Sequence, residues 1–282
     1  KEAEKNNAIV TVADGDEPVA ALDLYNFARE LSFDVISIGK GKNNPFNTFA
    51  TPSSLTKEAS LKQMNPKMLT SFVDGTKTMV EMTALANFLD FNIDIDGMHG
   101  IEATYENINQ YYIPKKDGGL LDESQVVDFA FGIAPGVFAV IYSEDDYVNY
   151  EMEYLKMGKG PYWTLARPYH LTSLEIPRTI RHIMLEKYSK LSAQSWNVEV
   201  VAHAKQDIEP GTNLGSIGGD YIYGKAQRIS SSKGFLPIGI AEDNVATKAI
   251  AKGNPIAIGE VDAQDNELCE YWDYQNQILD SD

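Results

Sequence analysis

The sequence is poor in cysteine and histidine. Cys269 is the single cysteine among 282 residues, so neither an internal disulfide nor an all-cysteine metal site can form. We therefore expect a reducing, cytoplasmic environment. The four histidines stand far apart and none falls in an H-E-x-x-H pattern, so we expect no metal site.

Positive charge and long apolar runs are also scarce. The chain has 24 Lys and Arg against 41 Asp and Glu, a formal net charge of -17, which opposes binding to nucleic acid and to anionic membranes. No apolar run approaches the ~20 residues that span a bilayer, and no signal peptide is visible. We expect a small-molecule ligand, and an anionic one needs a local basic pocket.

Against this acidic background, VISIGKGKNNP (residues 35–45) places two lysines and two glycines at the end of an apolar strand. In open α/β sheets, ligands collect outside the carboxyl ends of strands. Gly39 and Gly41 let backbone approach a ligand closely, and Lys40 and Lys42 supply ammonium groups. This pattern predicts an anion site; the alternative is a solvated loop.

The first residues predict a strand, helix, strand crossover. Residues 8–12 have the pattern of a strand, Pro18 suits the first turn of a helix, and a second strand begins at Asp34. Two strands are too few for a stable sheet. Either they join later strands, or an upstream segment is absent.

A dinucleotide loop is missing at this first turn. Asp14, Asp16 and Glu17 crowd a helix N-terminus that a pyrophosphate requires to be empty and positive. No G-x-G-x-x-G fingerprint occurs anywhere in the sequence.

The segment 65–89 is predicted to be mostly helical, with DGTKTMVEM at 74–82. In a continuous helix, Asp74, Lys77 and Glu81 share one stripe. Alternatively, Gly75 breaks the helix and Asp74 caps a second one. Either arrangement places two carboxylates and a lysine on one surface. The alternative interpretation is a solvent-exposed helix face with a Lys77–Glu81 ion pair.

Three further side chains are candidates for binding a ligand. His99 lies between two glycines in a turn-rich loop, where a surface histidine is the alternative. Arg167 is suited to holding a carboxylate or phosphate, and His170 to exchanging a proton near neutral pH. The alternative is that Arg167 pairs with Glu175 and that His170 supports the helix that follows.

The order of motifs resembles the homoserine-dehydrogenase-like oxidoreductases with a C-terminal SAF domain, including reductoisomerase-like enzymes that act on 1-deoxy-D-xylulose 5-phosphate. The matching pieces are VADGDEP (12–18), GKGKNNP (39–45), FVDGTKTMVEM (72–82), GMHG (97–100), PGVF (135–138), RPYHLTSLE (167–175), AKQDIEPGTNL (204–214) and GFLPIGIAE (234–242). They cover nearly the whole chain in the expected order.

This resemblance implies a mixed α/β (α+β) fold. We expect residues 1–45 to be the C-terminal part of a Rossmann-like nucleotide-binding domain and 46–196 a substrate-binding, catalytic and dimerisation domain. Residues 197–262, which are rich in β-forming residues and turns, are expected to form an SAF-like β domain, and 263–282 a tail. Most of the Rossmann domain, with its fingerprint, is expected to be missing from this sequence.

The resemblance also implies an NAD- or NADP-dependent oxidoreductase, expected as a homodimer. Its substrate is expected to be a phosphorylated keto sugar or branched polyol. Lys40 sits where the homoserine dehydrogenases carry a lysine, and DGT at 74–76 looks like their NGT, with aspartate in place of asparagine. The alternative is a module that binds a sugar acid without redox chemistry.

From clustering and resemblance together, we expect Lys40 or Lys77 to stabilise the developing alkoxide. Asp74 and Glu81 are expected to orient that lysine or share the proton transfer. The predicted substrate-binding residues are Lys42, Asn43, Thr76, His99, Arg167 and His170.

Overall fold

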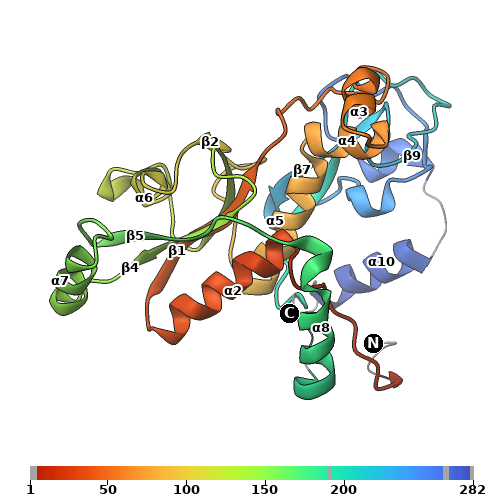
Figure 1. Ribbon diagram of the computed structural model, residues 1–282. Helices are drawn as coiled ribbons and strands as arrows, with labels where there is room; N and C mark the ends of the chain where they lie inside the picture. Colours follow the sequence, from red (N-terminus) through yellow and green to blue (C-terminus); the bar gives the residue numbers. More distant parts are fainter. Residues whose placement is uncertain (1–4, 188, 190–191, 263–266, 280–282) are drawn as a thin grey trace. The chain divides into compact units, whose positions relative to one another are not determined.

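A computed structural model describes residues 5–187, 189, 192–262 and 267–279 (Figure 1). The chain divides into two compact units. Unit 1 comprises residues 1–43 and 81–198, and unit 2 comprises residues 44–80 and 199–282. Each unit is therefore built from two separate stretches of chain. The four-part domain division expected from the sequence stays a prediction.

Unit 1 contains a mixed sheet, which confirms the α/β class. Among its described residues, five strands pair in the order β2-β3-β1-β4-β5. Strand β1 is central, parallel to β3 and antiparallel to β4. The strands are β1 (Asp34–Lys42), β2 (Ile101–Glu102), β3 (Val126–Phe131), β4 (Val137–Tyr142) and β5 (Tyr162–Arg167).

The central position of β1 follows from its sequence, since a strand covered on both faces reads as a nearly continuous apolar run. All its residues after Asp34 are buried. Helix α2 (Glu17–Glu30) and helix α6 (Ile108–Tyr111) lie on opposite sides of the sheet (Figure 1). Beside α6, Ile36, Phe138 and Tyr112 belong to one apolar core.

The strand predicted at residues 8–12 is wrong, because this segment forms neither helix nor strand. Its side chains are too poorly buried for a sheet interior, and Val10 is 73% exposed. The predicted strand, helix, strand crossover is therefore absent from the described residues. The second predicted strand, β1, does form, and it pairs with the later strands β3 and β4. This is the first of the two alternatives given for it above.

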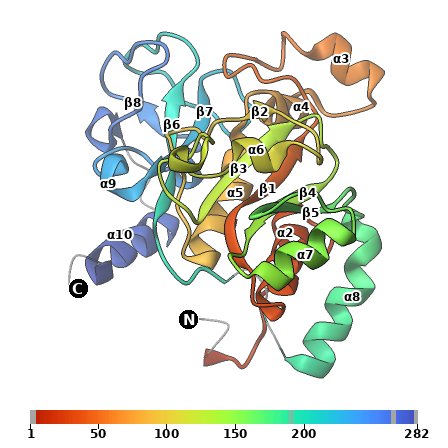
Figure 2. The same ribbon diagram turned by 90° about the vertical axis from the view of Figure 1, so that its left-hand side faces the viewer.

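The remaining helices of unit 1 follow the sheet strands. Helix α7 (Asp146–Tyr154) lies between β4 and β5, and α8 (Ile176–Arg181) comes after β5 (Figure 2). A π-helical turn, His182–Glu186, extends α8.

Unit 2 contains helices and short strands, and its second half confirms the β-rich character expected after residue 197. Its elements are α3 (Thr56–Leu61), α4 (Pro66–Val73), β7 (Ile222–Arg228), α9 (Ile229–Ser232), β8 (Val245–Ala246), β9 (Val261–Asp262) and α10 (Glu267–Leu279). Helix α5 (Thr76–Leu89) and strand β6 (Val198–Ala204) each cross the boundary between the units. Residues 263–266 and 280–282 of the predicted tail lie outside the described residues.

The helical segment 65–89 is broken at Gly75, so the alternative with two helices is confirmed. Asn65 caps α4 by accepting a hydrogen bond from the Lys67 N–H. Gly75 has φ +89°, and a Cβ there would lie 2.1 Å from the Phe46 ring. The Asp74 carboxylate then accepts a hydrogen bond from the Thr76 N–H, at 2.8 Å, where α5 begins.

Across the described residues, the helices are too short or too polar to pass through a membrane.

A buried lysine and carboxylate cluster at the end of the central strand

Lys40 is an ammonium-bearing side chain in the interior of unit 1. Its position on β1 is fixed from both sides, opposite Phe129 of β3 and Val137 of β4. Side chains alternate along a strand, so Lys40 shares a face with the fully buried Ile38. Only 5% of the lysine side chain is exposed. A charge so deeply buried requires carboxylate partners.

Two carboxylates meet this ammonium group. Lys40 Nζ donates to Glu17 Oε1 at 3.0 Å and to Glu81 Oε2 in a shorter contact. Glu17 is the first residue of α2, and Glu81 lies on α5. The side chains of Glu17 and Glu81 are 15% and 8% exposed, so both carboxylates are largely desolvated.

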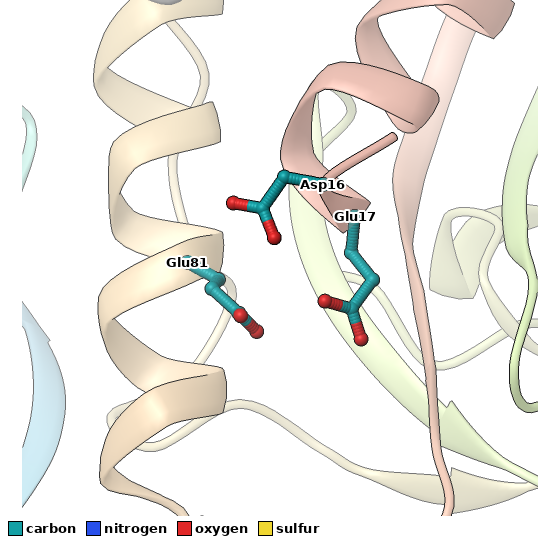
Figure 3. Close-up of side chains that lie close together, drawn as sticks. All are labelled: Asp16, Glu17 and Glu81. Atoms are coloured by element: carbon teal, nitrogen blue, oxygen red, sulfur yellow. The ribbon is translucent and has the colours of Figure 1, made fainter. Parts of the chain in front are cut away.

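Asp16 brings a third carboxylate to the same place. Figure 3 shows Asp16 and Glu17 projecting from the start of α2 toward Glu81 on α5. One oxygen from each carboxylate lies within 4.8 Å of the others. Such a trio has the oxygen donors that a divalent cation prefers. Here Lys40 Nζ already contacts two of the three carboxylates, so the cluster as it stands holds the lysine between Glu17 and Glu81.

The loop before α2 is anchored by the segment after β5. Asp14 is fully buried; its N–H donates to Thr179 Oγ1 at 2.7 Å, and its carboxylate accepts from the same hydroxyl at 2.9 Å. Gly15 has φ +88°, and a Cβ there would lie 2.4 Å from the Thr172 carbonyl oxygen. These contacts fix where α2 starts and hence where Glu17 lies.

His170, a predicted substrate-binding residue, belongs to this anchor. Its Nδ1 lies 2.9 Å from the Gly15 carbonyl oxygen, and its Nε2 lies 3.6 Å from Glu17 Oε1. His170 is therefore brought next to the carboxylate that holds Lys40.

Arg167 is bound to carboxylates of its own unit. Its guanidinium donates to Glu175, which is the ion pair weighed as the alternative, and lies 3.7 Å from Asp23. It also stacks over the ring of Tyr169, 5.0 Å from the centroid. These contacts favour a structural role for Arg167.

His99 lies in a second polar cluster, on the α6 side of the sheet. Its Nε2 is 2.8 Å from Asp94 Oδ2, and its N–H donates to the fully buried Asp128 at 2.9 Å. Tyr112 also donates to Asp128, at 2.9 Å. Burial raises the pKa of Asp128, and the backbone N–H groups that donate to its carboxylate oppose this rise. Burial and the neighbouring Asp128 carboxylate raise the pKa of Tyr112.

The predicted residues Asp74, Thr76 and Lys77 lie in unit 2. Asp74 is 2.8 Å from Lys205 Nζ, and both side chains are almost fully buried. Burial lowers the pKa of Lys205, against the opposing effect of Asp74. Thr76 Oγ1 accepts from the Gly224 N–H at 2.8 Å, and Lys77 Nζ lies 5.4 Å from the Phe72 ring centroid.

The last two predicted binding residues follow Lys40 along the chain. Lys42, at the end of β1, is 5% exposed, whereas Asn43 is exposed. The structure thus brings Lys40 and Glu81 into contact and His170 next to their cluster. It places Asp74, Thr76 and Lys77 in the other unit.

Gly39 and Gly41 were expected to let the backbone approach a ligand closely, and the structure shows that this expectation is wrong. A Cβ on Gly39 would lie 1.7 Å from the Asp128 carbonyl oxygen, and one on Gly41 would lie 2.4 Å from the Ala134 nitrogen. The room that these glycines provide is therefore filled by neighbouring backbone of the same unit rather than kept for a ligand.

Asp16 and Glu17 were recognised from the sequence only as an obstacle to a phosphate. One feature of the sequence could have indicated acidic neighbours for Lys40. A lysine on a buried, largely apolar strand must have a carboxylate partner. Which acid it would be depended on how α2 and α5 pack, and no local pattern encodes this. His99 and Asp74 were among the predicted site residues, but their partners Asp128 and Lys205 were not.

Comparison with known proteins gives one family. A family model described as "Oxidoreductase DRL, catalytic domain" matches residues 15–176. The match begins at Gly15 and includes all four residues of the Lys40 cluster: Asp16, Glu17, Lys40 and Glu81. No curated protein matches the chain.

Proposed function

This chain belongs to the family of oxidoreductase DRL catalytic domains, and from that premise we propose that it interconverts a carbonyl and a hydroxyl group on a small substrate. The proposed redox partner is NADP or NAD. The proposed substrate class is a phosphorylated keto sugar or a branched polyol, with a small amino or hydroxy acid as the second choice.

The observation that carries the proposal is the buried contact of Lys40 with Glu17 and Glu81. Reduction of a carbonyl places negative charge on its oxygen, and a preorganised cation in a water-poor site stabilises that charge far better than water does. An ammonium group held by two carboxylates is fixed in place before the substrate arrives.

Lys40 is proposed to supply the proton of the reaction. When bound, NAD(P)H would supply the hydride, with its two electrons, that the carbonyl carbon accepts. The C=O π bond breaks as an O–H bond forms with a proton from Lys40 Nζ, which leaves a neutral amine. Oxidation of the alcohol runs the same exchange in reverse. Glu17 and Glu81 hold Nζ in position, and His170 positions Glu17.

The start of α2, beside Lys40, does not fit the pyrophosphate of a dinucleotide. The one helix that starts beside Lys40 carries Asp16 and Glu17 at its N-terminus, where a phosphate would be repelled. The proposal of NADP or NAD as the cofactor therefore rests on the family resemblance. The residues of this chain are proposed only to bind the substrate and to transfer the proton.

The substrate class is supported by what lies next to the cluster. Lys42 adds a second ammonium group at the end of the same strand, and the exposed Asn43 follows it with an amide. A substrate that carries both a carbonyl and a phosphate is of the kind that two neighbouring lysines would bind.

The test is to follow NADPH and NADH consumption by the protein with 1-deoxy-D-xylulose 5-phosphate as the first probe, followed by small keto acids. We expect turnover with at least one of them and its loss in Lys40→Met. Lys116→Met, which removes an exposed lysine of the same unit, is the matched control and should leave turnover unchanged. Binding of these probes without any turnover would support the alternative, a binding module, and overturn the proposal.

A further inference from the structure

A polar cavity lies at the end of the sheet that is remote from the Lys40 cluster. Its volume is about 640 Å³, which is within the range of small-molecule binding sites. Its walls come from α6, the 3-10 turn Lys115–Asp117 and the loop between α7 and β5, all in unit 1. The lining side chains that carry hydrogen-bonding groups are Glu106, Asn109, Gln110, Asp117, Lys159 and Tyr162.

The sheet register separates this cavity from the site proposed for the redox reaction. Tyr162, which lines the cavity, pairs through Tyr142 of β4 with Asp34, the first residue of β1. From Asp34 to Lys40 the strand extends by about 20 Å. Among the described residues, none of the Lys40 cluster lines the cavity. A ligand in the cavity therefore does not contact Lys40.

Hydrogen bonds fix the walls of the cavity. Asn109 Nδ2 donates to the Tyr162 carbonyl oxygen at 2.9 Å, and the Tyr162 hydroxyl group donates to Asp117 Oδ2 at 2.7 Å. In the loop before β5, the Gly158 carbonyl oxygen accepts from Nε1 of the fully buried Trp163 at 3.2 Å. Helix α6, the 3-10 turn and this loop are thus each tied to β5, so the cavity is formed before any ligand arrives.

The charges around the cavity disfavour a charged ligand. A hydrogen bond from the Thr104 side chain lowers the pKa of Glu106, which is therefore an ionised carboxylate at neutral pH, and Asp117 is a second acidic group. A phosphate or carboxylate on the ligand would be repelled by both. Lys159 adds an ammonium group, and a purely cationic ligand would offer it no acceptor.

Hydroxyl groups suit every polar group on these walls, because a hydroxyl group both donates and accepts. They can donate to the carboxylates, accept from Lys159, and do either with the amide of Gln110. Asn109 Oδ1, which is buried, accepts no hydrogen bond in the described part of the chain. A buried acceptor without a donor costs free energy, and a donor from a bound hydroxyl group would remove that cost. The Tyr162 ring adds apolar surface for C–H groups.

We propose that this cavity is a second ligand site, which binds a neutral sugar or polyol without phosphate, carboxylate or amine groups. Lys159 and Gln110 donate to hydroxyl oxygens of the ligand, and Glu106 accepts from its hydroxyl groups. The ligand differs in charge from the phosphorylated substrate proposed for the Lys40 cluster. Because it lies remote from Lys40, it is bound without being oxidised or reduced.

Saturation-transfer NMR on the protein tests the ligand class, with D-xylose, D-glucose, maltose and putrescine as probes. We expect saturable binding of at least one of the neutral sugars. An excess of 1-deoxy-D-xylulose 5-phosphate should not displace it. Displacement would show that the sugar occupies the proposed redox site, and binding of putrescine alone would show that the acidic groups determine the ligand. Either result, or no binding of any neutral sugar, would overturn the proposal.

Substitution of two wall residues tests the location. In Gln110→Leu/Lys159→Met both side chains are exposed, so folding is preserved. The dissociation constant of the bound sugar should rise by a factor of about ten or more, the equivalent of one or two hydrogen bonds. Lys156→Met removes an exposed lysine of the same loop that does not line the cavity, and this matched control should bind the sugar unchanged.

Unchanged binding in the double variant, or an equal loss in Lys156→Met, would contradict the assignment of this cavity. All of these measurements are made without NADPH or NADH and without turnover. Their outcome is therefore independent of the proposed function.

Discussion

The ammonium group of Lys40, near the end of β1, donates a hydrogen bond to the carboxylate of Glu81 on α5. The two residues are 41 positions apart in the chain, and both side chains are at least nine-tenths buried. A charge removed from water is tolerated only when its partner is present. Each of these two residues therefore makes the other necessary.

Removing one partner alone should be costly. We expect Lys40→Met to lower the free energy of unfolding by about 3–5 kcal/mol, because it leaves two buried carboxylates without their cation. The double variant Lys40→Met/Glu81→Gln should recover part of this loss. Urea denaturation measures both. A loss below about 1 kcal/mol in Lys40→Met would show that the cluster is not a coupled ionic unit.

Gly15 controls where Glu17 lies. Gly15→Ala should destabilise the protein and reduce turnover, because the new Cβ would lie 2.4 Å from the Thr172 carbonyl oxygen. Gly211→Ala is the matched control: Gly211 has the same φ of +88° and nothing within 4 Å of its Cβ position. The control should show only the backbone penalty of about 1 kcal/mol. Equal losses of stability in the two variants would refute the steric argument.

Thr179 ties the loop before α2 to α8. We expect Thr179→Val to lower the free energy of unfolding by about 1–3 kcal/mol, because the buried Asp14 loses both a donor and an acceptor. The substitution keeps the shape of the side chain, so the loss reports on the hydroxyl group. Thermal unfolding measures it. An unchanged melting temperature would remove Thr179 from the anchor.

Lys205 in unit 2 predicts a pH dependence. Because burial lowers its pKa in the folded state, the unfolded chain binds more protons between that pKa and the ordinary value of 10.5. The unfolding free energy, relative to Lys205→Met, should therefore rise with pH across this window and level off above it. Denaturation at several pH values between neutral and 10.5 measures the difference. A difference that falls with rising pH would mean that Asp74 outweighs burial.

The sequence predicted the local elements better than their assembly. The apolar run before Gly39 and the break at Gly75 are local signals, and the structure confirms them. The strand expected at residues 8–12 failed because strand-forming residues do not make a strand without a neighbour to pair with.

The candidate site was predictable in part for the same reason. A lysine on a buried strand indicates that a carboxylate lies nearby, and Glu81 was among the predicted catalytic residues. The contribution of Asp16 and Glu17 depends on the anchor between the loop before α2 and α8. Those contacts join residues up to 165 positions apart. They become visible only when the chain is folded.

Chemical rescue of Lys40→Ala tests the proposed role of this lysine most directly. Turnover by the variant should fall by a factor of about 10²–10⁴, the usual contribution of a positioned proton donor. Added methylammonium should restore part of it in proportion to its concentration, since the missing group is an ammonium ion. Turnover within about twofold of the unsubstituted protein, in a correctly folded variant, would contradict the account.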